Sequence, residues 1–247
     1  MVSFAAEPIF KLGFFNVTNS FLDTLLVDFV IIGLIVAVNK KISLIPNALQ
    51  NFVEMIVETF YEITESVAGT RASKIFPYLM SFFLFILLAN WSGLIPGISA
   101  IGIKEEHLIV PFFRPATSDL NTTLGLALVS LVATHLMSIQ VTGIKDYIGR
   151  FISLNPINLY IGILELIGEI TKVISLSFRL FGNIFAGEVV LGTVSTIFAF
   201  LFPLPFLMLE VVVGLVQALV FSMLTMAFMA VLTTPHHHEE AKEVSKV

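Results

Sequence analysis

The residues of this sequence that can do chemistry are a few ionisable side chains inside long apolar segments. Between residues 159 and 202 the chain has no proline and is mostly apolar, yet it contains five ionisable residues: Glu165, Glu169, Lys172, Arg179 and Glu188. An arginine at the centre of a membrane helix costs about 2.5–3.5 kcal/mol even on the lenient insertion scale. Arg179 is therefore predicted to have a function that requires its charge.

Most of these residues fall on one side of a helix. At 100° per residue, five polar residues share a face roughly 80° wide: Glu165, Glu169, Lys172, Arg179 and Asn183. Glu188 points elsewhere. The next apolar segment has a second, smaller polar stripe, formed by Glu210, Gly214 and Gln217.

Glu169 and Lys172 have two interpretations: a local ion pair, which their i,i+3 spacing allows, or a functional role.

Arg179 differs because no acidic residue lies three or four positions away, so its partner is expected on another helix or another protein. Its guanidinium keeps its proton at any physiological pH and cannot relay protons. As a fixed cation it can favour ionisation of a passing carboxyl group, by roughly 4 kcal/mol at 4 Å and an effective dielectric of 20.

The segment around Arg179 is distinctive. Residues 175–188, SLSFRLFGNIFAGE, resemble the signature of the a subunit of F-type ATP synthases. The resemblance continues in residues 90–97 (NWSGLIPG), 115–124 (PATSDLNTTL) and 217–221 (QALVF). The matching segments occur in order and extend along most of the chain.

This resemblance implies a role for each polar residue. Arg179 would be the stator arginine that meets the carboxylate of a rotor ring, and Glu165 would belong to the cytoplasmic exit. The outer half-channel would be lined by Asn183, Glu188, Glu210 and Gln217. At position 210 some members have histidine, and Glu169 matches no family residue with an established role. The implied partners are a rotor ring of c subunits, b-type peripheral stalk subunits and the lipid bilayer, with no cofactor.

The implied mechanism is rotary: a proton enters from outside, neutralises a ring carboxylate, and leaves to the cytoplasm after that carboxylate passes Arg179. The resemblance also implies that the last two long helices form a hairpin steeply tilted against the ring. The coupling ion is expected to be H⁺, although the sequence leaves Na⁺ open.

Composition favours a membrane protein. Of the 247 residues 57% are hydrophobic and 13% charged, against about half apolar and a quarter charged in soluble domains. There is no cysteine for a disulfide or a thiolate metal site, and no basic block for nucleic acid. There is no phosphate-binding loop, so direct ATP binding is not expected.

The apolar runs predict an all-α membrane protein with about five spanning helices and one interfacial amphipathic helix, in a single membrane domain over residues 1–247. The expected spans are 21–38, 75–95, 120–144, 159–202 and 206–232, with an amphipathic helix over 45–67 and a polar tail over 235–247. A helix of some 40 residues would be about 60 Å long, twice the hydrocarbon thickness. The segment 159–202 must therefore tilt, run partly along the interface, or break at a glycine, with Gly168, Gly182 and Gly187 as candidates.

Lysine and arginine counts predict the orientation. With the N-terminus outside and the C-terminus in the cytoplasm, eight basic residues are cytoplasmic and three are outside. The eight are Lys40, Lys41, Arg71, Lys74, Lys145, Arg150, Lys242 and Lys246; the three are Lys11, Lys104 and Arg114. No cleavable signal peptide is recognised, and a bacterial plasma (inner) membrane is the expected location.

Other polar residues favour simpler interpretations. His236–His238 suit a solvated tail better than a metal site, and His135 a packed or hydrogen-bonded side chain. Asp23 and Asp28 are expected near the outer end of the first helix, where water reaches them. Residues 91–93 (WSG) are expected to pack closely at a helix end.

Two other functions were weighed. A self-contained ion channel or secondary transporter also buries charges in broken helices, but an internal repeat would be expected and none is found. A structural scaffold would leave the cost of Arg179 unexplained.

Overall fold

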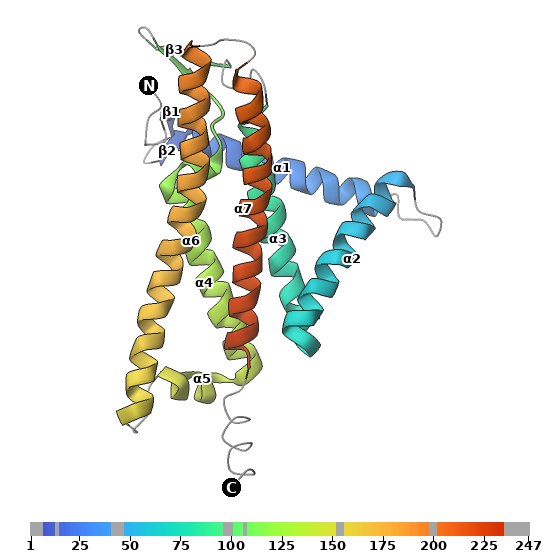
Figure 1. Cartoon of the computed structure of the whole chain (residues 1–247), viewed down its shortest axis with the longest axis vertical. Coiled ribbons are helices and arrows are strands. Elements are labelled where there is room, and N and C mark those ends of the chain that lie inside the picture. The colour runs from blue at the N-terminus through green and yellow to red at the C-terminus, as the bar shows by residue number, and fades with distance from the viewer. Residues whose placement is uncertain are drawn as a thin grey trace.

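The computed structural model describes residues 7–12, 15–40, 47–95, 101–105, 108–151, 156–197 and 202–234. Figure 1 shows the elements within these ranges. They are β1 (Pro8–Leu12), β2 (Phe15–Thr18), α1 (Asn19–Asn39), α2 (Ala48–Ala68), η1 (Gly69–Arg71), α3 (Ala72–Ser92), β3 (Gly102–Glu105), β4 (Leu108–Pro111), η3 (Ala116–Ser118), α4 (Leu120–Thr142), α5 (Ile144–Phe151), α6 (Pro156–Ile197) and α7 (Pro203–Leu232).

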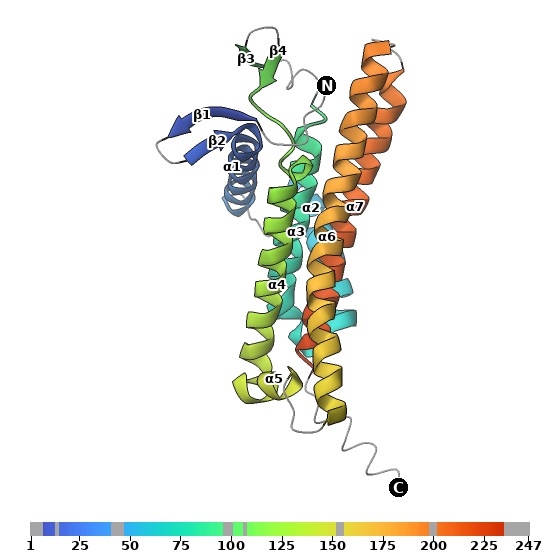
Figure 2. The same cartoon turned by 90° about the vertical axis from the view of Figure 1, so that its left-hand side faces the viewer.

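The chain is an all-α membrane protein, as the sequence predicts. By length and hydropathy, four described stretches can cross a membrane: Asn19–Asn39, Gln50–Ser92, Leu120–Thr142 and Pro203–Leu232. Two short antiparallel hairpins, β1–β2 and β3–β4, were not predicted. Both lie toward one end of the molecule, and α5 lies at the other (Figure 2).

Helix α6 is continuous over 42 residues, which corresponds to about 63 Å. The alternative of a break at Gly168, Gly182 or Gly187 is therefore wrong, because all three lie inside the helix. Helix α7 follows alongside α6 in both views (Figures 1 and 2). It begins at Pro203, in the first helical turn, where the missing proline N–H is tolerated.

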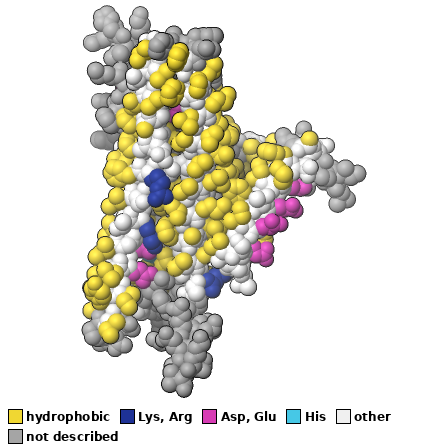
Figure 3. Space-filling view, in the orientation of Figure 1, with side chains coloured by type: hydrophobic (Ala, Val, Ile, Leu, Met, Phe, Trp, Pro, Cys, Tyr) yellow, Lys and Arg dark blue, Asp and Glu magenta, His cyan; other side chains and the backbone are white. Residues whose placement is uncertain are grey.

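Helices α2 and α3 form a hairpin rather than one rod. The turn between them contains Gly69 with φ of 56°, a conformation that glycine adopts without strain. The exposed side of α2 has the acidic residues Glu54, Glu58, Glu62 and Glu65, which form a row in the space-filling view (Figure 3). The amphipathic character of this segment is thus present, and its interfacial location stays a prediction.

The core lies where α3 packs against α7 and α4 packs against α6. Its fully buried side chains include Ile75, Leu79, Ile86, Leu180, Phe221 and Met229. Hydroxyl pairs also join the helices: Ser130 contacts Thr225 of α7 at 2.9 Å, and Thr123 contacts Ser177 of α6 at 3.2 Å. Such interhelical hydrogen bonds fix helix register where apolar burial cannot drive association in lipid.

Candidate functional site

Arg179 lies on the surface of α6, midway along the helix. Its guanidinium donates a hydrogen bond to Ser175 Oγ at 3.2 Å, one turn earlier. Within the described residues, Arg179 makes no ion pair with an acidic side chain. The structure thus presents a permanent cation on the outside of this chain, and the face drawn in Figure 3 is largely apolar with a few charged side chains.

The residues around Arg179 are small. Ser175, Gly182 and Ala186 lie on the same side of α6, and nothing within 4 Å would meet a Cβ added at Gly182. A neighbouring helix can therefore approach the backbone of α6 closely beside the arginine.

The two polar stripes predicted from the sequence meet one turn beyond Arg179. Asn183 Nδ2 on α6 donates a hydrogen bond to Gln217 Oε1 on α7, at 2.8 Å. Asn183 lies on the surface of α6, while Gln217 is buried. The pair connects the arginine face to the interior of the α6–α7 hairpin.

Glu210 points from α7 into the space that a glycine leaves on α6. A Cβ added at Gly187 would lie 2.5 Å from Glu210 Oε1. The carboxyl group is buried, and its Oε2 has no hydrogen-bond partner among the described residues. A buried carboxyl oxygen without a protein partner is costly, so this site suits a group that holds a proton or contacts water.

Glu188 pairs with Arg114, a residue that the sequence analysis assigned to a polar outer loop. Arg114 Nη2 lies 3.2 Å from Glu188 Oε2, and the Arg114 side chain is only 5% exposed. Arg114 thus lies in a loop, as predicted, but its side chain is buried just before η3 and pairs with α6. The sequence offered one indication that Arg114 is part of the packed structure, because it directly precedes the motif PATSD.

Asp23 was expected to be accessible to water, and this is wrong. Its side chain is 1% exposed, and its Oδ2 accepts hydrogen bonds from Ser92 Oγ and the Ala116 backbone N–H, both at 2.9 Å. Asp23 thus ties α1 to the end of α3 and to η3. Asp28, one turn further along α1, is exposed.

A second polar group joins α3 to α7 at the same level. Asn90 Nδ2 donates to the Gly214 carbonyl at 2.9 Å and its Oδ1 accepts from Thr117 at 2.7 Å. Trp91 Nε1 donates to the Val211 carbonyl at 3.1 Å. Residues 91–93 therefore pack closely at a helix end, as the sequence suggested. The contacts fix α7, and with it Glu210 and Gln217, against the rest of the bundle.

The other polar residues of α6 lie nearer its start. Glu165 is partly exposed. Lys172 Nζ contacts Glu169 Oε1 at 2.7 Å, so the local ion pair, one of the two interpretations of these residues, is present. The tail over residues 235–247, with His236–His238, lies outside the described residues. Within the described residues, no group of three or more potential metal ligands occurs.

Comparison with known proteins gives a consistent result. The profile of the family described as ATP synthase A chain matches residues 21–230. Subunit a of the ATP synthase of Moorella thermoacetica is 31% identical over 222 residues, which cover 90% of this chain and 94% of the relative. Subunit a from Syntrophobacter fumaroxidans is 36% identical over 212 residues, covering 84% and 81% of the two chains.

Proposed function

This chain belongs to the ATP synthase A chain family, and we propose that it is the proton-conducting stator subunit of a rotary F-type ATP synthase. In this proposal it supplies two offset half-channels and the arginine that drives deprotonation of a rotor-ring carboxylate. Nucleotides bind elsewhere in the complex.

The position of Arg179 supports this proposal most strongly. A guanidinium in a membrane requires an anionic partner or water, and the acids of the described chain do not pair with it. The missing partner is the carboxylate of a ring of c subunits, which the small residues Ser175 and Gly182 allow to approach. Arg179 favours the ionised carboxylate as it passes.

The outer half-channel runs between α6 and α7. Glu188 with Arg114 forms its entrance, Glu210 its buried midpoint, and the Asn183–Gln217 pair its end beside the ring. From Glu188 to Arg179 is nine residues, about 13 Å along α6. A proton can thus pass from carboxyl to carboxyl and reach the ring next to the arginine.

The cytoplasmic path lies on the other side of Arg179. Glu165 is 14 residues earlier, about 21 Å along α6. A proton crossing directly between the paths would pass an unscreened buried cation, which is strongly unfavourable. Protons therefore cross only on the ring, and their passage turns it.

The proposal also includes the tilt, orientation, location and stalk type predicted from the sequence and the resemblance. With α6 about 63 Å long, the α6–α7 hairpin tilts steeply in the bilayer, and α1 runs across it in Figure 1, as a helix closer to the membrane normal would. The N-terminus lies outside and the C-terminus in the cytoplasm of a bacterium, in its plasma (inner) membrane. The peripheral stalk is of the b type.

The test uses inverted membrane vesicles with the assembled complex. Arg179→Ala is expected to abolish ATP-driven proton pumping while the amount of assembled complex stays normal. Arg179→Lys keeps the positive charge but lacks the planar guanidinium with its several N–H donors, and its proton pumping is expected to be strongly impaired. Normal coupled pumping in Arg179→Ala would refute the proposal.

A further inference from the structure

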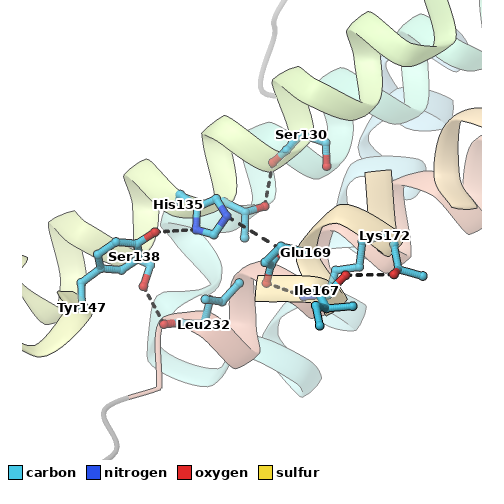
Figure 4. Close-up of polar contacts among 10 residues, drawn as sticks. Ser130, His135, Ser138, Tyr147, Ile167, Glu169, Lys172 and Leu232 are labelled. Atoms are coloured by element: carbon cyan, nitrogen blue, oxygen red, sulfur yellow. Dashed lines mark hydrogen bonds and ion pairs between the residues drawn. The ribbon is translucent and has the colours of Figure 1, made fainter. Parts of the chain in front are cut away.

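Four polar side chains from three helices meet near the start of α6, at the end of the molecule where α5 lies (Figure 4). They are His135 of α4, Tyr147 of α5, and Glu169 and Lys172 of α6. The sequence predicts a packed or hydrogen-bonded His135 and leaves the roles of Glu169 and Lys172 open. The structure joins them into one chain of contacts, which we call the histidine cluster.

The contacts run in series from α5 through α4 to α6. Tyr147 Oη lies 2.9 Å from His135 Nδ1, and His135 Nε2 lies 3.8 Å from Glu169 Oε2. The other carboxyl oxygen, Oε1, accepts a hydrogen bond from Lys172 Nζ at 2.7 Å. The Glu169 side chain in the middle of this series is 6% exposed, against 21% for His135 and 28% for Lys172.

On its inner side the histidine cluster borders a pocket between α4, α6 and α7. Its lining includes Ser130, Thr134, Glu169 and Lys172. Hydroxyl and charged groups of this kind can hold water. Lys172 is seven residues, two helical turns, before Arg179 on nearly the same face of α6.

We propose that His135 and Glu169 form a proton relay in the cytoplasmic path, between the pocket near Lys172 and the cytoplasm. This inference rests on the proposed function, and specifies residues for its cytoplasmic path. Imidazole is suited to this task because it gains and loses a proton near neutral pH.

The contacts define the relay step. The step starts from a neutral His135 with its hydrogen on Nδ1, which donates to Tyr147 Oη. A protonated Glu169 gives its proton to the free Nε2, through a bridging water because the two atoms are 3.8 Å apart. The imidazolium then passes its Nδ1 proton to Tyr147 Oη while the tyrosine hydroxyl releases its own proton toward the cytoplasm. The ring is left with its hydrogen on Nε2, and exchange of that proton to Nδ1 through water restores the starting tautomer. Lys172 holds the ionised Glu169 that remains, and so resets the site for the next proton.

The surroundings support a titrating histidine. Within the described side chains, the titratable and charged groups facing His135 are Tyr147 on α5 and Glu169 on α6, with Lys172 beyond Glu169. Phe151 of α5 also contacts the His135 and Tyr147 rings. The aromatic rings hold the imidazole in place beside the Glu169 carboxylate.

The test measures proton-driven ATP synthesis and ATP-driven pumping in vesicles while the pH on the cytoplasmic side is varied. In wild type, both rates are expected to change through the imidazole range, around pH 6.5. His135→Gln keeps a polar side chain of similar size that cannot relay a proton. We expect rates several-fold lower per assembled complex, a flattened pH profile, and recovery with added imidazole.

Two further variants separate relay from packing. Tyr147→Phe keeps the aromatic contact and should also flatten the pH profile. It tests the relay if the His135→Gln variant fails to assemble. Ser138 lies on the same helix as His135, and Ser138→Ala removes its buried hydrogen bond to the Leu232 carbonyl of α7. This variant should leave the shape of the pH profile unchanged. A wild-type profile in His135→Gln or Tyr147→Phe would overturn the relay, while loss of pumping in Arg179→Ala would still support the proposed function.

Discussion

Asn183 of α6 and Gln217 of α7 are joined by a 2.8 Å hydrogen bond between their side-chain amides. The bond lies one helical turn beyond Arg179 and links the exposed face of α6 to the buried face of α7. It sets the register of the two longest helices at the point where the proposed outer path reaches the ring.

Replacing Gln217 by Leu removes this bond, so the Asn183 amide loses its partner on α7. Because Asn183 is exposed, we expect a stability loss of only about 1 kcal/mol. Proton pumping is expected to fall more than the amount of complex does. The matched control is Ser222→Ala on α7, whose hydroxyl bonds only within its own helix, and equal losses in the two variants would contradict a specific role.

Gly187→Ala tests the close approach of Glu210 to α6. The added Cβ would lie 2.5 Å from Glu210 Oε1, so the carboxyl group must move, at a cost of about 1–3 kcal/mol typical of overpacking. Pumping is expected to decrease. Combining this change with Glu210→Asp, which shortens the acid, should restore part of the rate, and a double variant worse than both single variants would argue against this contact.

The Arg114–Glu188 pair predicts a coupling that a double-mutant cycle can measure. Removing either partner leaves the other charge without its ion pair, which costs 3–5 kcal/mol when both are buried. A loss of about 1–3 kcal/mol is expected here because the Glu188 side chain is 27% exposed. In thermal unfolding of the detergent-purified complex, Arg114→Gln with Glu188→Gln should be more stable than the sum of the single effects predicts. Additive effects would show that the pair does not couple.

Gly182→Val tests whether the face around Arg179 is a contact surface. Within this chain a Cβ at Gly182 meets nothing within 4 Å, so folding of the subunit should be little affected. The larger side chain is expected to weaken co-purification of the ring and to lower pumping. Gly33→Val on α1, where a Cβ also meets nothing, is the control, and similar behaviour of the two variants would contradict the assigned face.

The features that could be predicted from the sequence are those that depend on helical periodicity and on the free-energy cost of a charge in a bilayer. The isolation of Arg179 followed from the spacing of acids along one helix, and the i,i+3 spacing of Glu169 and Lys172 allowed their local pair as one of two interpretations. Neither inference requires knowledge of how the helices pack. The same is true of the all-α class, since apolar length alone defines it.

The contacts between distant segments could not be predicted. Asp23 is buried because Ser92 and the Ala116 backbone come to it from other segments. Arg114 is buried because the chain turns inward before η3 and reaches Glu188, 74 positions later. In the sequence, Asp23 and Arg114 are simply polar residues near the ends of helices. Helical periodicity does not predict which loops fold back and bury such residues.

The most direct measurement of the central claim is disulfide formation between this chain and the ring. The sequence contains no cysteine, so a cysteine introduced at Ser175, one turn from Arg179, would be unique. Paired with a cysteine placed beside the ring carboxylate, it is expected to form a disulfide in assembled membranes, whereas a cysteine at the exposed Phe29 of α1 should not. Cross-linking from position 29 and none from position 175 would show that the ring meets another face, and would contradict the role assigned to Arg179.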